Sequence, residues 1–293
     1  NDYEVILKNK FADIQAISVY GGEEVGYPGK VFICIKPKSA NTLSTATKEF
    51  LKSEILSKQN VVTVRPEFVD PQIFKLALST VVVYDKTRLA TSRDILRTKV
   101  KALYETINAT YVGEFLESFR ESNLSYEIKN LDDSVISSNT RVTMVAEVTT
   151  SSQKLDQYKY SFNNKLYHPF AGFLADKGGI FSSSLFSRLG RSNKSGFDED
   201  GYGNIRLYDL VDGTKVYVNR KAGRLDYENG IVEFLYDFDP EDTTFTISVI
   251  PESVDVLATR DMILEIDSGA STVDAVEINE TDLLKNINLS RSF

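Results

Sequence analysis

A Gly-Lys pair in the stretch GGEEVGYPGKVFICIKPKS, residues 21–39, could in principle hold a phosphate. A phosphate-binding loop has a glycine five residues before its final glycine, and its lysine is followed by a serine or threonine that contacts magnesium. Here Glu24 stands at the first of these positions, and Val31 follows Lys30. The apolar run also follows the glycines, whereas a phosphate loop leads from a strand into a helix. The stretch therefore predicts a turn that enters a strand, and we expect no nucleotide or other cofactor.

Nucleophilic and metal-assisted chemistry have few candidate residues. His168, the single histidine, lies in LYHPF before a proline, so a catalytic triad or a histidine zinc site would depend on this one residue. Cys34, the single cysteine, lies in VFICI, where a small buried side chain is the expected role. One cysteine allows no internal disulfide and is typical of a reducing compartment. We expect no catalytic residue and no enzyme activity.

The carboxylates offer a calcium site and a glycan-cleaving site as hypotheses. Asp198, Glu199 and Asp200 precede Gly201, but a calcium loop of the EF-hand type needs glycine at position six and glutamate at position twelve. Here the glycine comes too early, and position twelve is Asp209. We expect a solvated acidic turn and no metal. Paired carboxylates for glycan hydrolysis are available among 42 acidic residues, but the chain has no tryptophan to serve as a sugar platform.

The composition favours a globular protein with protein partners. The net charge of −8 opposes binding to nucleic acid or to an anionic membrane, because both need a basic surface. Hydrophobic residues make up 42% of the 293 residues, enough for a core and, at this length, for two domains. No apolar run approaches the ~20 residues of a membrane helix. The sequence begins with Asn1 and shows no signal peptide, so we expect a fragment of a longer chain.

The first half alternates strand and helix patterns. The expected elements are a strand at 31–37, a helix at 47–58 capped by Ser44 or Thr45, strands at 61–66 and 74–84, a helix at 93–111 capped by Ser92, and a strand at 141–148. This β-α-β-β-α-β order predicts an α+β fold with a ferredoxin-like split βαβ domain at 26–150. Residues 1–25 are expected to be the end of a preceding domain or a connector.

The second half shows a different pattern. Residues 151–203 are rich in Ser, Gly, Asn and Lys and predict an irregular arm or linker. Beyond them, Asp-Gly at 212–213 and Asn-Gly at 229–230 separate apolar-rich runs, which is typical of β-hairpins. Another hairpin is expected around Ser-Gly-Ala at 268–270. We therefore expect a small antiparallel β domain with a C-terminal tail at 204–293.

The order of segments in the first half resembles a known family. A YGG turn leads into PGKVFICIKP, followed by NVVTVRPEFVDP and then FLESFRESNLSYEIKNLDDSVISSNTRV. This succession resembles the baseplate J-like family and, within it, the baseplate wedge proteins of T-even-type contractile-tailed phages. The most specific part is 119–124 followed by 131–142, because family members carry a similar phenylalanine-serine-leucine run, an aspartate and a strand. The resemblance covers about residues 1–148 and implies that the opening glycines form a structural turn.

The resemblance implies a structural, late-expressed subunit of the virion, located in the tail baseplate and assembled in the host cytoplasm. Such subunits form homodimers, contact other baseplate wedge subunits and neighbouring wedges, and build a ring around the central hub. They reorient during the baseplate change that triggers sheath contraction and DNA ejection. The alternative is a receptor- or glycan-binding tail module in the hairpin-rich half. It would need exposed aromatic residues, and the available tyrosines are Tyr202, Tyr208, Tyr217 and Tyr227.

Interfaces are the expected functional sites of such a subunit. Two aromatic-rich segments flank the expected domains and supply the candidate interface residues. These are Tyr111, Phe115 and Phe119 in one segment and Phe181 and Phe186 in the other. A stable two-fold interface buries on the order of 1,600 Å2 or more. The expectation is that Phe186→Asp leaves the chain folded and weakens assembly.

Overall fold

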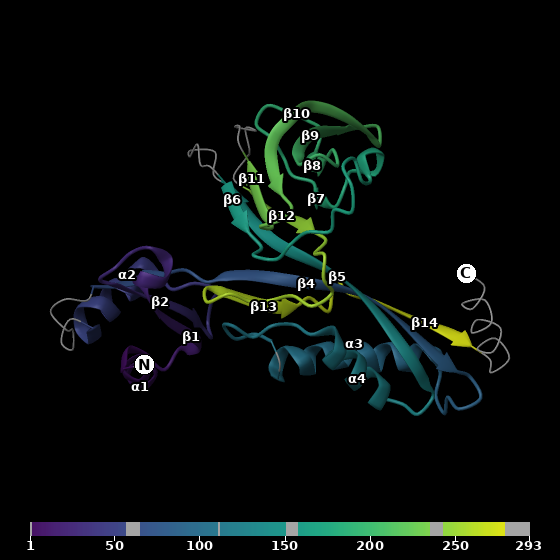
Figure 1. Cartoon of the computed structure of the whole chain (residues 1–293), viewed down its shortest axis with the longest axis horizontal. Helices are drawn as coiled ribbons and strands as arrows, with labels where there is room; N and C mark the ends of the chain where they lie inside the picture. The colour runs from purple at the N-terminus through teal and green to yellow at the C-terminus, as the bar shows by residue number, and fades with distance from the viewer. Residues whose placement is uncertain (1, 57–64, 111, 151–157, 235–242, 279–293) are drawn as a thin grey trace. The chain divides into compact units, whose positions relative to one another are not determined.

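The computed structural model describes residues 2–56, 65–110, 112–150, 158–234 and 243–278 (Figure 1). Its contacts divide the chain into two compact units. The smaller unit contains Asn1–Ile73, Thr110–Phe119 and Leu257–Glu265, and the larger unit contains Phe74–Ala109, Arg120–Val256 and Ile266–Phe293. Each unit is therefore assembled from three separate stretches of the chain, unlike the four consecutive segments that the sequence predicts.

The smaller unit is built around a three-stranded sheet. Its elements are α1 (Asp2–Lys10), β1 (Ile14–Gly21), η1 (Gly22–Val25), β2 (Lys30–Pro37), α2 (Thr45–Phe50), η2 (Leu51–Leu56), β3 (Arg65–Val69) and most of β13 (Met262–Ile266). β1 and β2 pair antiparallel, whereas β2 and β3 pair parallel. A parallel pair needs a crossover connection, which here contains α2 and η2. Ser44 caps α2, because its Oγ accepts a hydrogen bond from the Thr47 amide at 3.1 Å.

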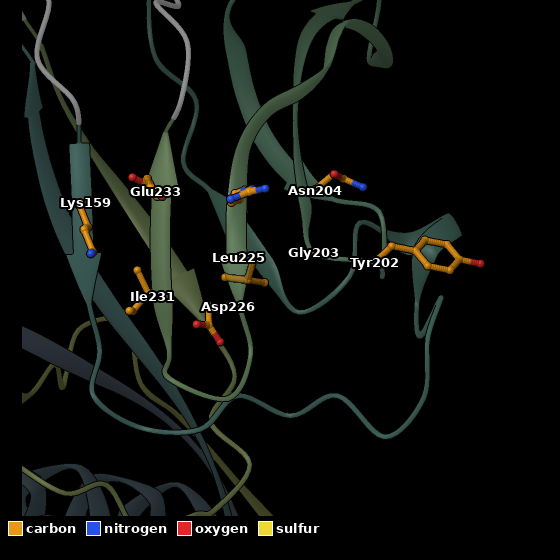
Figure 2. Close-up of a pocket in the computed structure, with 9 residues that line it drawn as sticks. Lys159, Tyr202, Gly203, Asn204, Leu225, Asp226, Ile231 and Glu233 are labelled. Atoms are coloured by element: carbon orange, nitrogen blue, oxygen red, sulfur yellow. The ribbon is translucent and has the colours of Figure 1, made fainter.

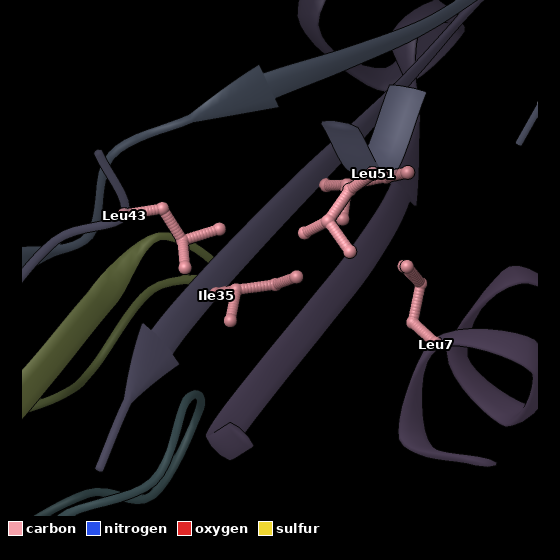
Figure 3. Packing of buried hydrophobic residues seen from close by; sticks show 5 residues of the cluster. Leu7, Ile35, Leu43 and Leu51 are labelled. Carbon is pink, nitrogen blue, oxygen red and sulfur yellow. The ribbon is translucent and has the colours of Figure 1, made fainter. Parts of the chain in front are cut away.

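Strand β2 is buried on both of its faces. One hydrophobic cluster contains Leu7, Ile33, Ile35, Leu43 and Leu51 (Figure 3). A second cluster contains Ala16, Cys34, Phe115 and Ile263. Successive side chains of a strand point to opposite faces, so Ile33 and Ile35 enter the first cluster while Cys34 enters the second. Burial on both faces explains why this strand is written as the continuous apolar run VFICI.

The larger unit contains two helices and most of the strands. Its elements are β4 (Gln72–Asp85, from Phe74 onward), α3 (Arg93–Thr110), α4 (Glu121–Asn130), β5 (Val135–Thr150), β6 (Tyr158–Ser161), η3 (Ala175–Lys177), β7 (Phe181–Ser183), β8 (Ser195–Glu199), β9 (Asn204–Val211), β10 (Thr214–Asp226), β11 (Ile231–Phe234), β12 (Thr243–Val249) and β14 (Thr272–Ile278). The strands follow one another in the order β14-β4-β5-β12-β7-β8-β9-β10-β11-β6. β4 and β5 pair antiparallel, and β14 pairs parallel with β4.

Helix α3 confirms the amphipathic pattern expected from the sequence. Its buried residues are Leu96, Val100, Leu103, Tyr104 and Ile107, which lie on one face at spacings of three and four. The Tyr104 hydroxyl donates a hydrogen bond to Thr80 Oγ1 at 2.7 Å and so joins α3 to β4. Ser92 precedes the helix, and its Oγ accepts a long hydrogen bond of 3.4 Å from the Ile95 amide. The shorter helix α4 buries Leu124 and Ile128.

The α+β class is confirmed, but the ferredoxin-like split βαβ arrangement is not. The expected strands at 31–37 and 74–84 belong to different sheets, as β2 and β4. β1, which lies inside the expected connector at 1–25, pairs with one edge of β2, and β3 pairs with the other. Since both edges of β2 are occupied, β4 has no edge of β2 with which to pair. The expected strand at 61–66 falls mostly outside the described residues, and β3 begins at Arg65.

The segment expected to be an irregular arm contributes strands to the sheet instead. Residues 151–157 lie outside the described residues, but from 158 to 203 the chain forms β6, β7 and β8. β6 pairs with β11, β7 with β12, and β8 with β9. The strands are three to five residues long, so their serines and glycines obscured the pattern. β6 and β7 pair with strands that follow much later in the sequence, whereas β8 pairs with the next strand, β9.

Two of the three expected hairpins are confirmed. β9 and β10 are joined at Asp212 and Gly213, whose φ angles of 49° and 78° suit a two-residue hairpin loop. β10 and β11 are joined through a turn that contains Asn229 and Gly230. The expected hairpin around residues 268–270 is wrong for β14, because Thr272–Ile278 pairs in parallel with residues 79–85 of β4. The expected C-terminal tail, residues 279–293, lies outside the described residues.

Candidate interaction surfaces and the polar network beneath them

The candidate interface residues are buried wherever the structure describes them. Phe115 and Phe119 are 8% and 2% exposed and belong to the smaller unit, while Phe181 and Phe186 are 0% and 2% exposed and belong to the larger unit. Tyr111 lies outside the described residues. Aromatic residues that are already packed inside their own chain cannot serve as exposed contact residues. The structure thus shows four of these side chains packed inside the chain, and their role in an interface stays a prediction.

Phe186 belongs to a stack of aromatic rings in the larger unit. Its ring centroid lies 4.5 Å from that of Phe245 and 5.1 Å from that of Phe197, with interplanar angles below 30°. Phe197 in turn lies 4.7 Å from Phe234. These residues come from β8, β11, β12 and the segment after β7, so the stack ties four parts of the sheet together. It is a structural core and not a docking surface.

The acidic segment at 198–200 is a buried structural network and not a solvated turn. Asp198 is 1% exposed and accepts hydrogen bonds from Arg206 Nε at 2.8 Å, Lys215 Nζ at 2.7 Å and the Tyr217 hydroxyl at 3.0 Å. The pKa of the Tyr217 hydroxyl is raised, mainly because the group is partly buried and secondly because the negative charge of Asp198 is close. A buried carboxylate is tolerated when it is paired and hydrogen-bonded in this way. Within the described residues no group of side chains has the arrangement of a metal site.

Glu199 anchors the next part of the network. It accepts hydrogen bonds from the Ile180 amide at 2.8 Å, the Gly201 amide at 2.9 Å and the Tyr227 hydroxyl at 2.6 Å. Burial and the adjacent carboxylate raise the pKa of the Tyr227 hydroxyl, which therefore stays protonated and continues to donate. His168 stacks on Tyr227 with ring centroids 3.8 Å apart, and its Nε2 lies 2.9 Å from the Gly201 carbonyl oxygen. The single histidine is thus engaged in local packing.

The single cysteine and the Gly-Lys pair, which were also considered for chemistry from the sequence, have structural roles. Cys34 is buried, and this burial raises the pKa of its thiol, so the thiolate needed for nucleophilic attack is disfavoured. Lys30 of the Gly-Lys pair begins β2 and forms an ion pair with Glu67 of β3 at 2.6 Å. Gly29 before it has a φ of 80°, as expected of a turn glycine. The glycine-rich stretch is therefore a turn into a strand.

An open depression of about 490 Å3 lies over strands β6, β11, β10 and the start of β9 (Figure 2). Cross-strand pairing places Lys159, Glu233, Arg224 and Asn204 in one row across these strands. Alternating charges on neighbouring strands stabilise a solvent-facing sheet surface. The Tyr202 ring points away from this row in Figure 2, so it does not form the aromatic platform that a sugar site would need.

Exposed aromatic residues lie elsewhere; Tyr202 was among the tyrosines considered from the sequence, whereas Phe170 and Tyr167 were not singled out. Phe170 and Tyr202 are 62% and 66% exposed, and Tyr167 is 42% exposed. Phe170 and Tyr167 belong to LYHPFAGFLA, residues 166–175, which contains no charged residue. A run of ten uncharged residues inside an expected arm is the sequence signal that could have located this surface. No helix in the described part of the chain is long and apolar enough to cross a bilayer.

Comparison with known proteins finds similarity to one kind of protein in parts of both units. A family model described as baseplate structural protein gp6, C-terminal domain I, matches residues 1–69, and one described as C-terminal domain III matches residues 74–147. The baseplate wedge protein gp6 of Enterobacteria phage T4 is 26% identical over 166 residues. This alignment covers 56% of the chain and 24% of the T4 protein, so the chain spans about a quarter of that relative's length.

Proposed function

We propose, from the premise that this chain is a baseplate wedge structural protein related to gp6, that it helps to build the ring of wedges around the central hub of a phage tail. In this role its units act as rigid building blocks that keep their folds while the wedges reorient. That reorientation accompanies the baseplate change that triggers sheath contraction and DNA ejection. The chain binds other subunits and performs no chemical step.

The observation that carries the proposal is the agreement between the family matches and the structural division. The domain I match ends at residue 69, inside the first stretch of the smaller unit. The domain III match begins at residue 74, where the larger unit also begins, at Phe74. The boundary between the two family matches thus coincides with the first boundary between the compact units, while the domain III match also spans residues 110–119 of the smaller unit.

The internal chemistry of the chain supports a structural role. Asp198 and Glu199, the most buried carboxylates of the acidic segment, satisfy their oxygens with groups of the larger unit itself. In the smaller unit Lys36, which is 6% exposed, forms an ion pair with Glu265. Charged groups used in this way stabilise a single geometry and are not held ready for substrate. Rigid units connected by loops can change orientation without internal rearrangement.

The proposed partners are a second copy of the chain, other baseplate wedge subunits and neighbouring wedges. The proposed location is the tail baseplate of the virion, after assembly in the host cytoplasm. Because the aromatic candidates at 115, 119, 181 and 186 are buried, the proposed contacts use other, exposed residues. Stable contacts of this kind bury on the order of 1,600 Å2.

Immunogold electron microscopy of intact tails, with antibody raised against this chain, tests the proposal. Gold particles at the baseplate are the expected result. Gold particles on fibres or spikes would instead favour the receptor-binding alternative. Absence of label, with the protein also missing from tails by mass spectrometry, would contradict the proposal, because a ring subunit must be present in every tail.

A further inference from the structure

An exposed aromatic patch stands out on the larger unit. We define it as Tyr167, Phe170 and Phe173 of the loop at 166–175, together with Tyr202 from the turn between β8 and β9. The exposed fractions of Phe170 and Tyr202 are among the largest for aromatic residues in the described part of the chain. Large aromatic side chains are costly to leave in water, so their gathering at one surface points to a binding site.

The rings of the patch lie in contact with one another. Phe173 is at the centre, with its ring centroid 5.4 Å from that of Tyr167 and 5.4 Å from that of Phe170, both in edge-to-face geometry. Tyr202 lies against the same loop, since a methyl group added at Gly172 would be only 2.8 Å from its hydroxyl oxygen. Three of the rings are therefore in mutual contact, and Tyr202 lies beside them against Gly172 of the same loop.

The backbone beneath the patch is held firmly. The Gly172 amide donates to the Gly201 carbonyl oxygen at 2.7 Å, and a side chain at Gly201 would lie 2.7 Å from the Gly172 carbonyl carbon. The Ala175 carbonyl oxygen accepts a hydrogen bond from Arg206, which also binds the buried Asp198. Leu174 has a φ of 55°, an unfavourable conformation for leucine that must be maintained by its surroundings.

A rigid aromatic surface is suited to binding because its side chains lose little freedom when a partner arrives. Residues of this kind, at the centre of an interface, typically contribute most of its binding energy. The polar network around Asp198 and Glu199 therefore has a second consequence, which is to hold the patch in one conformation. The patch combines exposure, mutual contact and a fixed backbone.

The chemistry of the patch selects among possible partners. No charged residue interrupts positions 166–175, and the nearby Lys165 is compensated by Glu228 at 3.3 Å and Glu252 at 3.4 Å. A lipid surface would require basic residues around the aromatic ones. A sugar would require outward polar side chains beside the rings, but the His168 Nε2 is already at hydrogen-bonding distance from Gly201, and the Tyr202 ring points away from the charged row over β6, β11 and β10 (Figure 2). An uncharged protein surface fits best.

The size of the patch argues against self-association through it. A fully exposed aromatic side chain offers about 200 Å2, so the three most exposed rings present roughly 350 Å2. If two copies met through this patch, they would bury about 700 Å2 in total, well below the ~1,200 Å2 at which stable interfaces begin. The patch is too small to hold two copies together by itself, which favours a different protein as its partner, within an assembly that supplies further contacts.

We infer that this patch docks into an uncharged apolar pocket on a different protein of the tail, with Phe170 as the central anchor. The inference rests on the proposed baseplate role, because the small contact needs the assembly to hold both proteins together. Linking two contacts in one assembly raises the effective concentration for the weaker one. The contact is thus strengthened by the other interfaces of the chain.

Site-specific cross-linking in intact tails tests the inference. The photoreactive residue p-benzoyl-phenylalanine is placed at position 170 of the full-length protein, and the tails are purified, irradiated and analysed by mass spectrometry. The expected result is a cross-link from position 170 to an apolar segment of a different tail protein. A cross-link to a second copy, a cross-link to another part of the same polypeptide, or the absence of any cross-link would overturn the inference.

Two measurements keep the outcomes separate. If the protein is missing from purified tails, the proposed baseplate role fails and this inference fails with it. If the protein is present but position 170 gives none of the expected product, only the inference fails. For the cross-linked partner, Phe170→Ala and Tyr202→Ala are expected to weaken binding about tenfold, as for central aromatic anchors. Tyr126→Ala, a change at a tyrosine equally exposed on α4, should change the Kd less than twofold.

Discussion

The ring stack around Phe186 makes a direct test of the core of the larger unit. Phe186→Ala removes a ring that is 2% exposed and lies 4.5 Å from Phe245 and 5.1 Å from Phe197. The loss of buried apolar surface and the cavity left behind are expected to lower the free energy of unfolding by about 3–5 kcal/mol. Since unfolding of a unit of this size responds to urea by about 1–3 kcal/mol per molar, the midpoint should fall by at least ~1 M.

Hydrogen exchange measured by mass spectrometry in increasing urea is the assay, because peptides from β7, β8 and β12 report on the larger unit separately. Phe170→Ala is the matched control, as its ring is 62% exposed, and it should change the free energy by less than about 0.5 kcal/mol. Equal effects of the two substitutions would refute the assignment of Phe186 to the core. The same burial reverses the expectation for Phe186→Asp, because a carboxylate inside the stack should unfold this region and not merely weaken assembly.

Two further predictions concern the polar network and the pH. Gly179→Ala should lower the Tm by several degrees, because Gly179 has a φ of 69° and a methyl group there would lie 2.0 Å from Glu199. Gly190→Ala is the control, because Gly190 has a similar φ of 68° but open space around it. The difference between the two variants therefore measures the clash apart from the backbone strain. Hydrogen bonds from the Ser134 hydroxyl and amide, aided by a nearby lysine, hold the pKa of Asp132 below its usual range. Its carboxylate therefore stabilises the fold above the ordinary carboxyl pKa and stops doing so as the pH falls through the lowered value, so Asp132→Asn should flatten the acid limb of stability measured by urea unfolding between pH 7 and pH 2.

Local signals in the sequence predicted local structure well. The helix α3 follows from apolar residues at spacings of three and four, and β4 follows from strict alternation. The expected hairpin at Asp212-Gly213 has a positive φ at both residues, and Gly230 supplies a positive φ in the turn that contains Asn229. Each of these features is decided by residues that are close together in the chain.

Long-range pairing could not be predicted in the same way. Nothing in Thr272–Ile278 shows that it pairs with β4, almost 200 residues earlier and in parallel orientation. The three short strands β6, β7 and β8 are too brief for their alternation to stand out among serines and glycines. The discontinuous units have the same origin, since contacts between distant stretches define them while composition changes only along the chain.

Residue type alone does not show which aromatic side chains are buried and which are exposed, and the location of the contact surface depends on that difference. Phe181 and Phe170 are both phenylalanines in the same expected arm, yet one is 0% and the other 62% exposed. Phe181 lies in β7, which pairs with β12, whereas Phe170 lies in a loop outside the strands, held by single backbone hydrogen bonds such as that from the Gly172 amide to the Gly201 carbonyl oxygen. Pairing with a distant strand decides which aromatic residue enters the core.

The residues covered by the two family models and the residues beyond them form different features of the structure. The two family models end by residue 147, within the sheet and helices formed by β4, α3, α4 and β5. The polar network around Asp198 and the aromatic patch around Phe170 both lie beyond that residue. A cross-link from position 170 therefore tests a part of the chain that the two family models do not cover.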